Sequence, residues 1–193
     1  PFFTQREKSH LMEVEQTGFP GLLVITPRVF SDARGFFKDT DQEERYKEAG
    51  VDASFVQDNA SRSTAGILRG LHYQIQHPQA KLVHVMEGEI LDVCVDLRKN
   101  SPTFGQSYSI RLTGENHKQL YVPPGFAHGF YVISPQVDFV YKCGDYYYPE
   151  HDRTLLWNDP DLRIDWPLSG EPLLSEKDRR GLPLKECEVF ESL

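Results

Sequence analysis

The sequence predicts an all-β fold in one domain, and three observations support this. From Gly21 onward, short apolar runs alternate with turn residues at intervals of about 8 to 12 residues, a spacing typical of β-sandwiches and barrels. Few stretches carry the capping residues and the periodicity that a helix needs. The chain has 193 residues, of which 39% are hydrophobic, and domains of about 150 residues are common. We expect a single domain over residues 1–193, of which residues 1–15 are an N-terminal extension that is disordered or left over from cloning.

Each expected strand is a run of aliphatic, aromatic and β-branched residues that a turn residue ends. In chain order the runs are GLLVITPRVF (21–30), ASFVQDN (53–59), GILRGLHYQ (66–74), KLVHVMEG (81–88), EILDVCVDL (89–97), SYSIRL (107–112), KQLYVPPG (118–125), HGFYVIS (128–134) and VDFVYKC (137–143). The glycine in MEGEI, Gly88, predicts a tight hairpin in which the runs on either side of it pair.

Two short segments read as helices. Residues 41–50 begin with acidic residues and end at Gly50, and Ser175 is a suitable cap for a helix over residues 175–181. The turn-rich tail after Trp166 is expected to wrap the surface.

The run EILDVCVDL alternates between two faces of its strand. We expect one face to belong to the core and the other to carry acids. The first face holds Leu91, Val93, Val95 and Leu97, and the second holds Ile90, Asp92, Cys94 and Asp96.

The composition disfavours several classes of partner and site. A net charge of -8 repels nucleic acid, whose binding depends on many Lys and Arg contacts to phosphate. The three cysteines, Cys94, Cys143 and Cys187, are odd in number and widely spaced, which argues against a disulfide scaffold or a Cys-x-x-Cys zinc site and favours the cytoplasm. No apolar run reaches the roughly 18 residues of a spanning helix, so no membrane partner is expected.

Two stretches carry histidines in a characteristic setting: GILRGLH ends at His72, and PPGFAH ends at His128. Together they resemble the two motifs of the cupin barrel, which implies a double-stranded β-helix of two antiparallel sheets. Metal-binding cupins continue the first motif as His-x-His and then a glutamate, whereas position 74 is Gln and residues 74–85 contain no glutamate. Because a divalent ion needs three or four converging ligands, we expect a metal-free site.

An isolated His72 would most simply be a hydrogen-bonded structural histidine. However, we expect Arg69, Lys81, His128 and Tyr141 to line the same barrel. Ionisable groups that face an interior are costly unless they are paired or functional, so the group favours a functional site.

A longer series of motifs, in order over residues 20–185, resembles the dTDP-4-dehydrorhamnose 3,5-epimerase family. The motifs are ARGFF, FVQDN, RGLHYQ, DLRKNSPTFGQ, PPGFAHGF, VYKCGDYYYP and WNDPDLRIDWP. The resemblance implies an isomerase without a cofactor that inverts C3 and C5 of dTDP-4-dehydro-6-deoxyglucose, the step before the reductase that makes dTDP-rhamnose. It also implies a homodimer in which residues near the N-terminus help to complete the neighbour's site.

This chemistry requires a base, a partner for the oxyanion and an acid on the far side of the sugar. The resemblance assigns His72 as the base, Asp178 of SEKD as its orienting carboxylate, and Tyr141 as the acid. Lys81 is expected at the C4 oxygen, where charge develops in the enolate. Without the resemblance, Asp178 reads as a helix-start acid, Lys81 as a solvated strand-end lysine and Tyr141 as core.

The remaining substrate-binding residues also come from the resemblance. They are Arg34 and Arg69 at the diphosphate, Tyr147 stacked on thymine, and Asp39, Gln57, Asp58, Asn59, Lys81, His128, Asp152 and Lys177 elsewhere in the site. Asp39 and Asp152 stand where the family commonly has glutamate, and three consecutive tyrosines, 146–148, leave the stacking residue open by one position. Without the resemblance, either arginine would be interpreted as part of a surface salt bridge, QDN as a polar turn and YYY as an aromatic cluster on the surface.

Three alternatives remain open at this point. A related dTDP-sugar cupin could be a 3- or 5-monoepimerase or a 3,4-ketoisomerase, and retention of both His72 and Tyr141 disfavours the ketoisomerase. A binding module would need no His-Lys-Tyr set. A metal-dependent dioxygenase would need the ligands that are missing.

Overall fold

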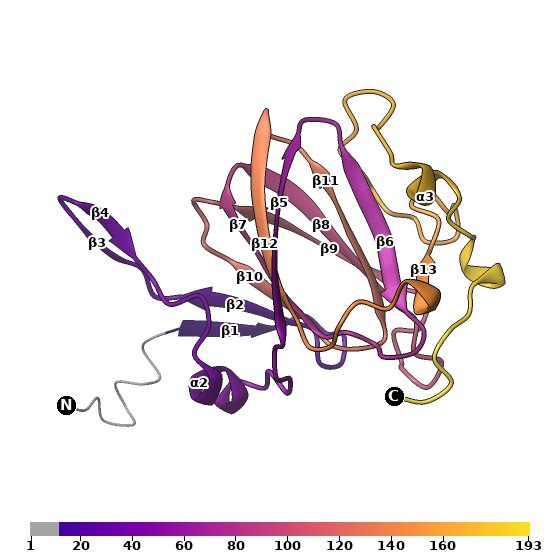
Figure 1. The fold of residues 1–193 in the computed structure, drawn as a ribbon, viewed down its shortest axis with the longest axis horizontal. Helices are drawn as coiled ribbons and strands as arrows, with labels where there is room; N and C mark the ends of the chain where they lie inside the picture. The colour runs from indigo at the N-terminus through magenta and orange to yellow at the C-terminus, as the bar shows by residue number, and fades with distance from the viewer. Residues whose placement is uncertain (1–11) are drawn as a thin grey trace.

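Residues 12–193 are described by a computed structural model, in which two antiparallel sheets face each other around a common interior (Figure 1). The elements are β1 (Met12–Gln16), β2 (Leu23–Pro27), β3 (Phe30–Asp32), β4 (Gly35–Phe37), α2 (Glu43–Glu48), β5 (Gln57–Thr64), β6 (Leu68–Gln74), β7 (Lys81–Glu87), β8 (Glu89–Asp96), β9 (Ser107–Thr113), β10 (Gln119–Val122), β11 (Phe126–Val132), β12 (Gln136–Cys143), η1 (Pro149–His151), β13 (Asp152–Thr154), α3 (Glu176–Arg179) and η2 (Leu184–Glu186). The predicted all-β, cupin-type class is confirmed, and both expected helices form.

One sheet has six strands in the order β1-β2-β10-β7-β12-β5, and the other has five in the order β13-β6-β11-β8-β9. Apolar side chains from both sheets fill the space between them. Leu22, Val24, Val83, Val85, Ile90, Cys94, Leu112, Leu120, Val122, Phe126, Phe130, Val132, Val137 and Phe139 form this inner core. The polar pocket described below also draws its walls from both sheets.

The expected hairpin around Gly88 is wrong. β7 pairs with β10 and β12, whereas β8 pairs with β11 and β9 in the opposite sheet. Gly88 has φ +91°, and a Cβ there would lie 2.2 Å from the carbonyl oxygen of Gln136. The glycine is needed because the chain crosses tightly from one sheet to the other beside another strand, and not because a hairpin turns there.

β8 alternates as expected, but both of its faces are buried. Leu91, Val93 and Val95 lie in an outer hydrophobic cluster, while Ile90 and Cys94 belong to the inner core. The acids of the inner face are buried as well and have partners, which is what allows charged groups there.

Each sheet is covered on its outside. The tail after β13 packs over the five-stranded sheet, as the sequence predicted for the residues after Trp166, and buries Leu155, Leu162, Trp166 and Phe190 against it. α2 and its flanks cover the six-stranded sheet through Tyr46. The tail lies beside β6 and β13, where it carries α3 to the rim of the barrel (Figure 1).

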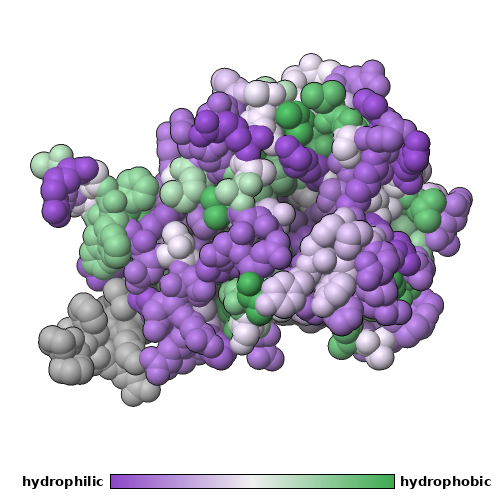
Figure 2. Space-filling model, viewed as in Figure 1, coloured by the Kyte–Doolittle hydropathy of each residue, from purple (hydrophilic) through white to green (hydrophobic). Residues whose placement is uncertain are grey.

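The hairpin of β3 and β4 projects away from the barrel (Figure 1). Its three phenylalanines are 44%, 54% and 64% exposed at positions 30, 36 and 37, and Figure 2 shows hydrophobic side chains on this projection. Such an exposed apolar group typically marks an interaction surface.

The first eleven residues of the expected extension lie outside the described residues. Residues 12–15, which that expectation included, belong to β1 and pair with β2, so this part is an ordered edge of the sheet. Within residues 12–193, no helix is long and apolar enough to cross a membrane.

Candidate active site

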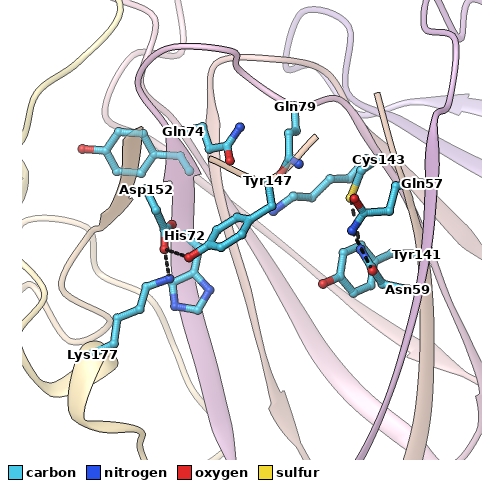
Figure 3. Close-up of a pocket in the computed structure, with 12 residues that line it drawn as sticks. Gln57, Asn59, His72, Gln74, Gln79, Tyr141, Cys143, Tyr147, Asp152 and Lys177 are labelled. Atoms are coloured by element: carbon cyan, nitrogen blue, oxygen red, sulfur yellow. Dashed lines mark hydrogen bonds and ion pairs between the residues drawn. The ribbon is translucent and has the colours of Figure 1, made fainter. Parts of the chain in front are cut away.

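A cavity of about 370 Å³ opens between the two sheets, a size within the usual range for small-molecule sites. Its walls are mostly polar and come from β5, β6, β7, β12 and the segments on either side of β13 (Figure 3). The lining residues are Gln57, Asn59, His72, Tyr73, Gln74, Gln79, Lys81, Tyr141, Cys143, Tyr147, Asp152 and Lys177.

Strand register places one wall of the cavity. In the six-stranded sheet, Cys143 of β12 is the Cα partner of both Lys81 on β7 and Gln57 on β5. Two residues earlier on β12, Tyr141 is opposite Asn59. Because residues two apart on a strand face the same side, these side chains form two adjacent rows that point into the cavity.

The opposite wall carries His72, on β6 of the five-stranded sheet. Its Nε2 lies 2.5 Å from Oδ1 of Asp178, which is on α3. Ser175 caps this helix by accepting a hydrogen bond from the backbone N–H of Asp178, so the cap fixes the position of the carboxylate. The sequence left open whether these two residues meet, and they do.

Burial lowers the pKa of the His72 imidazole, although the Asp178 carboxylate acts in the opposite direction. For Asp178, burial raises the pKa, but hydrogen bonds from its neighbours, His72 first, outweigh this and hold it below the ordinary value. The pair therefore consists of a neutral imidazole and an ionised carboxylate near neutral pH, the arrangement in which a histidine can accept a proton.

Lys81 and Tyr141 contribute a cation and a phenol to the facing wall. Burial lowers the pKa of the Lys81 ammonium. Burial also raises the pKa of the Tyr141 phenol, which nearby Arg69 partly offsets. A phenol with a raised pKa remains protonated and can act as a proton donor.

Three side chains at the rim of the cavity are linked by a hydrogen bond and an ion pair. Tyr147 OH donates to Asp152 Oδ2 at 3.0 Å, and Lys177 Nζ forms an ion pair with the same oxygen. Figure 3 shows Tyr147 extending across the cavity between His72 and the wall that carries Cys143.

Several residues expected at the site lie next to it rather than in its lining. Asp58 is on the outer face of β5, where it bonds Lys142 at 3.0 Å, and Arg69 donates to Ser63 Oγ. His128 is the Cα partner of His72 on β11. It is only 7% exposed, and both oxygens of Asp92 lie within 3.0 Å of its Nε2.

Arg34 and Asp39 lie outside this chain's cavity. The Arg34 side chain is 90% exposed at the tip of the β3-β4 hairpin and pairs with Asp32, and Asp39 pairs with Arg45 at 2.7 Å. A cavity built from one chain therefore does not include the segment that the resemblance places at the diphosphate.

The sequence did not predict four of the lining residues, namely Tyr73, Gln74, Gln79 and Cys143. Two of them were accessible from strand periodicity, because Gln74 follows His72 by two positions and Cys143 follows Tyr141 by two. Gln74 was considered only as a missing metal ligand.

Among residues 12–193, one group of potential metal ligands lies close together: Asp92, Cys94 and His128, whose ligand atoms are within 4.8 Å of one another. All three are buried. Asp92 and His128 bond each other, and burial raises the pKa of the Cys94 thiol well above its ordinary value, so the thiol stays protonated and is a poor ligand. The contacts of this trio are those of a buried polar pair, and the expectation of a metal-free site stays a prediction.

Comparison with known proteins identifies close relatives. Residues 16–186 match a family described as dTDP-4-dehydrorhamnose 3,5-epimerase. A dTDP-4-dehydrorhamnose 3,5-epimerase of Pseudomonas aeruginosa is 51% identical over 180 residues, which cover 93% of this chain and 99% of the relative.

Solved structures agree with this. A structure of dTDP-6-deoxy-D-glucose-3,5-epimerase from Legionella pneumophila Philadelphia 1, in complex with dTDP-4-keto-L-rhamnose, is 47% identical, with a TM-score of 0.91 and coverage of 94% of this chain and 99% of that one. A 3'-monoepimerase variant from Streptomyces bikiniensis, in complex with dTDP, is 32% identical, with a TM-score of 0.84 and coverage of 89% and 87%.

Proposed function

The chain belongs to the dTDP-4-dehydrorhamnose 3,5-epimerase family, and from this we propose how its own residues perform the reaction on dTDP-4-dehydro-6-deoxyglucose. The enzyme inverts C3 and C5 of this nucleotide sugar and yields dTDP-4-dehydro-L-rhamnose. Both carbons flank the C4 ketone, so loss of either proton gives an enolate, and a proton returned to the opposite face inverts the centre.

In this proposal His72 removes the proton. Asp178 holds the imidazole through Nε2, which leaves Nδ1 to accept the proton and stabilises the imidazolium once it forms. The lowered pKa of His72 keeps it in the neutral form that can accept a proton.

Tyr141 returns a proton from the other side. The observation that carries the proposal is that His72 and Tyr141 belong to opposite sheets and line the same cavity (Figure 3). A sugar ring held between them would present one face to the imidazole and the other to the phenol, which is what inversion requires.

Lys81 supplies the positive charge for the enolate. It lies one strand away from Tyr141, in the same wall of the cavity. A preorganised donor of this kind typically contributes about 3 to 4 kcal/mol to lowering the barrier.

The nucleotide would extend toward the rim, where Tyr147 stacks on thymine and Asp152 and Lys177 contact the substrate. Gln57 and Asn59, in the wall beside Tyr141, complete the pocket, and Asp58, Arg69 and His128 act from just outside the cavity lining.

We also propose a homodimer in which Arg34 of one chain approaches the diphosphate at the other chain's cavity and Asp39 contacts the substrate elsewhere in that site. The support is that the hairpin carrying Arg34 projects from its own barrel with exposed phenylalanines, and an arginine fork binds phosphate oxygens well. The free thiols of Cys94, Cys143 and Cys187 agree with a cytoplasmic location.

The test is incubation with dTDP-4-dehydro-6-deoxyglucose in deuterated water, followed by NMR. The double epimerase exchanges the protons at both C3 and C5. Exchange at one position only would indicate a monoepimerase, an activity that one structural relative has, and no exchange at all would indicate a binding module.

His72→Ala is expected to abolish exchange at both positions while changing the Kd for dTDP by less than about threefold, because the imidazole contacts the sugar and not the nucleotide. Calorimetry with dTDP provides that control. Undiminished exchange by this variant would remove His72 from the mechanism.

A further inference from the structure

We propose that Gln74 is a positioning residue that selects Tyr147, among three consecutive tyrosines, as the ring that lies over the cavity. This inference rests on the proposed function for the role of Tyr147, but it stands on contacts of a residue to which that function gives no part. Gln74 lies two residues after His72 on β6 and is only 4% exposed.

The Gln74 side chain holds the backbone on both sides of Tyr147. Its Nε2 donates to the carbonyl oxygen of Tyr146 at 3.1 Å, and its Oε1 accepts from the backbone N–H of Tyr148 at 2.7 Å. These are the two bonds that a neighbouring strand would make with residues 146 and 148, so the amide replaces a strand where no strand is present.

The same amide reaches a second loop. Nε2 also donates to the carbonyl oxygen of His77 at 2.7 Å, and the His77 ring stacks on Tyr148 with centroids 4.3 Å apart. Both hydrogens of the amide and its oxygen thus have partners, and a buried amide with all its bonds made holds its neighbours in one arrangement.

Gln74 also fixes the far end of the Tyr147 side chain, though indirectly. Its Cα partner on β13 is Asp152, whose Oδ2 accepts the hydrogen bond from Tyr147 OH. The side chain of Gln74 thus holds the backbone beside Tyr147, and the backbone of Gln74 lies opposite the residue that binds the Tyr147 hydroxyl.

The fates of the three tyrosines follow from this. Tyr148 is turned to His77, and neither Tyr146 nor Tyr148 is among the residues that line the cavity. Of the three, Tyr147 alone is among the residues that line the cavity, which favours it as the stacking residue. The hydrogen bonds at residues 146 and 148 fix the backbone on both sides of Tyr147. Because successive side chains of extended backbone point to opposite faces, the side chain of Tyr147 then points to the face opposite those of Tyr146 and Tyr148.

The experiment compares Gln74→Met with the matched control Gln79→Met. Gln79 also lines the cavity, but it donates one hydrogen bond to the carbonyl oxygen of Asp145 and none to the residues beside Tyr147. We expect Gln74→Met to raise the Kd for dTDP about tenfold and Gln79→Met to raise it less than about threefold. Equal effects of the two variants would overturn the inference.

A double-mutant cycle tests whether Gln74 acts through Tyr147. In a Tyr147→Ala background, Gln74→Met should raise the Kd for dTDP by less than about twofold, because the ring that it positions is gone. A tenfold effect that persists in this background would mean that Gln74 is only structural, and the proposal would fail.

Gln74→Glu provides a variant of nearly identical shape in which the change is one of charge and hydrogen-bond donors. Its carboxylate can accept from Tyr148 N–H but cannot donate to the carbonyls of Tyr146 and His77. The Kd ratio between this variant and the unmutated protein should fall toward one as pH decreases and the carboxyl becomes protonated. A ratio that does not change with pH would contradict the proposed positioning role of Gln74.

Amide hydrogen exchange separates this inference from the proposed function. Exchange of the Tyr148 amide, which bonds Gln74 Oε1, should be at least about tenfold faster in Gln74→Met than in Gln79→Met, whether or not the protein binds dTDP. If the unmutated protein does not bind dTDP, the proposed function fails. The exchange result alone then decides whether Gln74 positions the loop of residues 146–148. Unchanged protection of the Tyr148 amide would overturn the inference.

Discussion

The Nε2 atom of His72 lies 2.5 Å from Oδ1 of Asp178, although 106 residues separate them in the chain. Asp178→Asn should lower kcat by about 100-fold or more, since the amide keeps the shape but favours the wrong tautomer and does not stabilise the imidazolium. The kinetic assay follows formation of the inverted sugar, and an effect below about threefold would show that the pair is not used in catalysis.

The same substitution should also shift the pH profile. The Asp178 carboxylate raises the pKa of His72 against the lowering effect of burial, so its removal lowers that pKa further. The base must be neutral, and activity is lost as pH falls through its pKa. The acid limb of kcat/KM should therefore move to lower pH in Asp178→Asn, and a shift to higher pH would contradict the assignment.

Tyr141→Phe should separate proton removal from inversion. His72 can still remove a proton and return solvent deuterium to the same face, so exchange persists while the inverted product forms at least about 100-fold more slowly. NMR in deuterated water measures both quantities in one sample. Equal loss of exchange and inversion would mean that the phenol is needed to form the enolate.

Arg34→Ala and His72→Ala should complement each other if the hairpin serves the partner's cavity. Each homodimer would have two impaired sites, but a mixed dimer would contain one site with neither substitution. Mixing the two variants after dissociation should restore about a quarter of the unmutated activity, since half of the randomly paired dimers are mixed and each has one intact site. No gain on mixing would place Arg34 at its own chain's site or at none.

His84 is expected to make stability depend on pH. Burial, together with the charges of Lys38 and Lys142, lowers the pKa of His84 to about 4, and its Nδ1 has no hydrogen-bond partner among the described residues. Because the unfolded imidazole titrates near 6.5, the unfolded state binds more protons between about pH 6.5 and pH 4, and stability is lost as pH falls through this window.

The comparison variant is His84→Gln, which removes the titrating group. Its free energy of unfolding should decrease less than that of the unmutated protein between pH 7 and pH 4.5, by about 2 kcal/mol. Urea unfolding at several pH values measures the difference. Parallel curves for the two proteins would show that His84 does not contribute.

The sequence predicted best those strands that contain a clear run of apolar residues. β5 differs from these strands, because its sequence QDNASRST is mostly polar and shows no alternation of apolar residues. Its pairing with β12 holds it at the edge of the sheet. Its register is set by the partner strand, which sequence periodicity does not contain. The crossing at Gly88 was misread for a related reason, since a glycine with positive φ suits both a hairpin and a close approach to Gln136.

For the site, motifs gave most of the residues that face the cavity and also Asp178, the partner of His72, but they did not give the part that Gln74 plays. Gln74 has three hydrogen-bond partners, at His77, Tyr146 and Tyr148, and none of these contacts has a signal in the local sequence. Arg34 is a second case, because the sequence motif gave no sign that its side chain is 90% exposed and pairs with Asp32 of the same hairpin.

α3 follows every strand of the barrel in the chain, yet it carries both Lys177 and Asp178. During synthesis, all the strands therefore leave the ribosome before Asp178, the carboxylate that orients the base. A single proteolytic cut in the exposed stretch near Leu168, upstream of α3, could free the helix while leaving the framework covalently intact. Such a nicked molecule would keep the wall of Lys81 and Tyr141 but lose Lys177 and the carboxylate that orients His72, so activity would require an uncut tail.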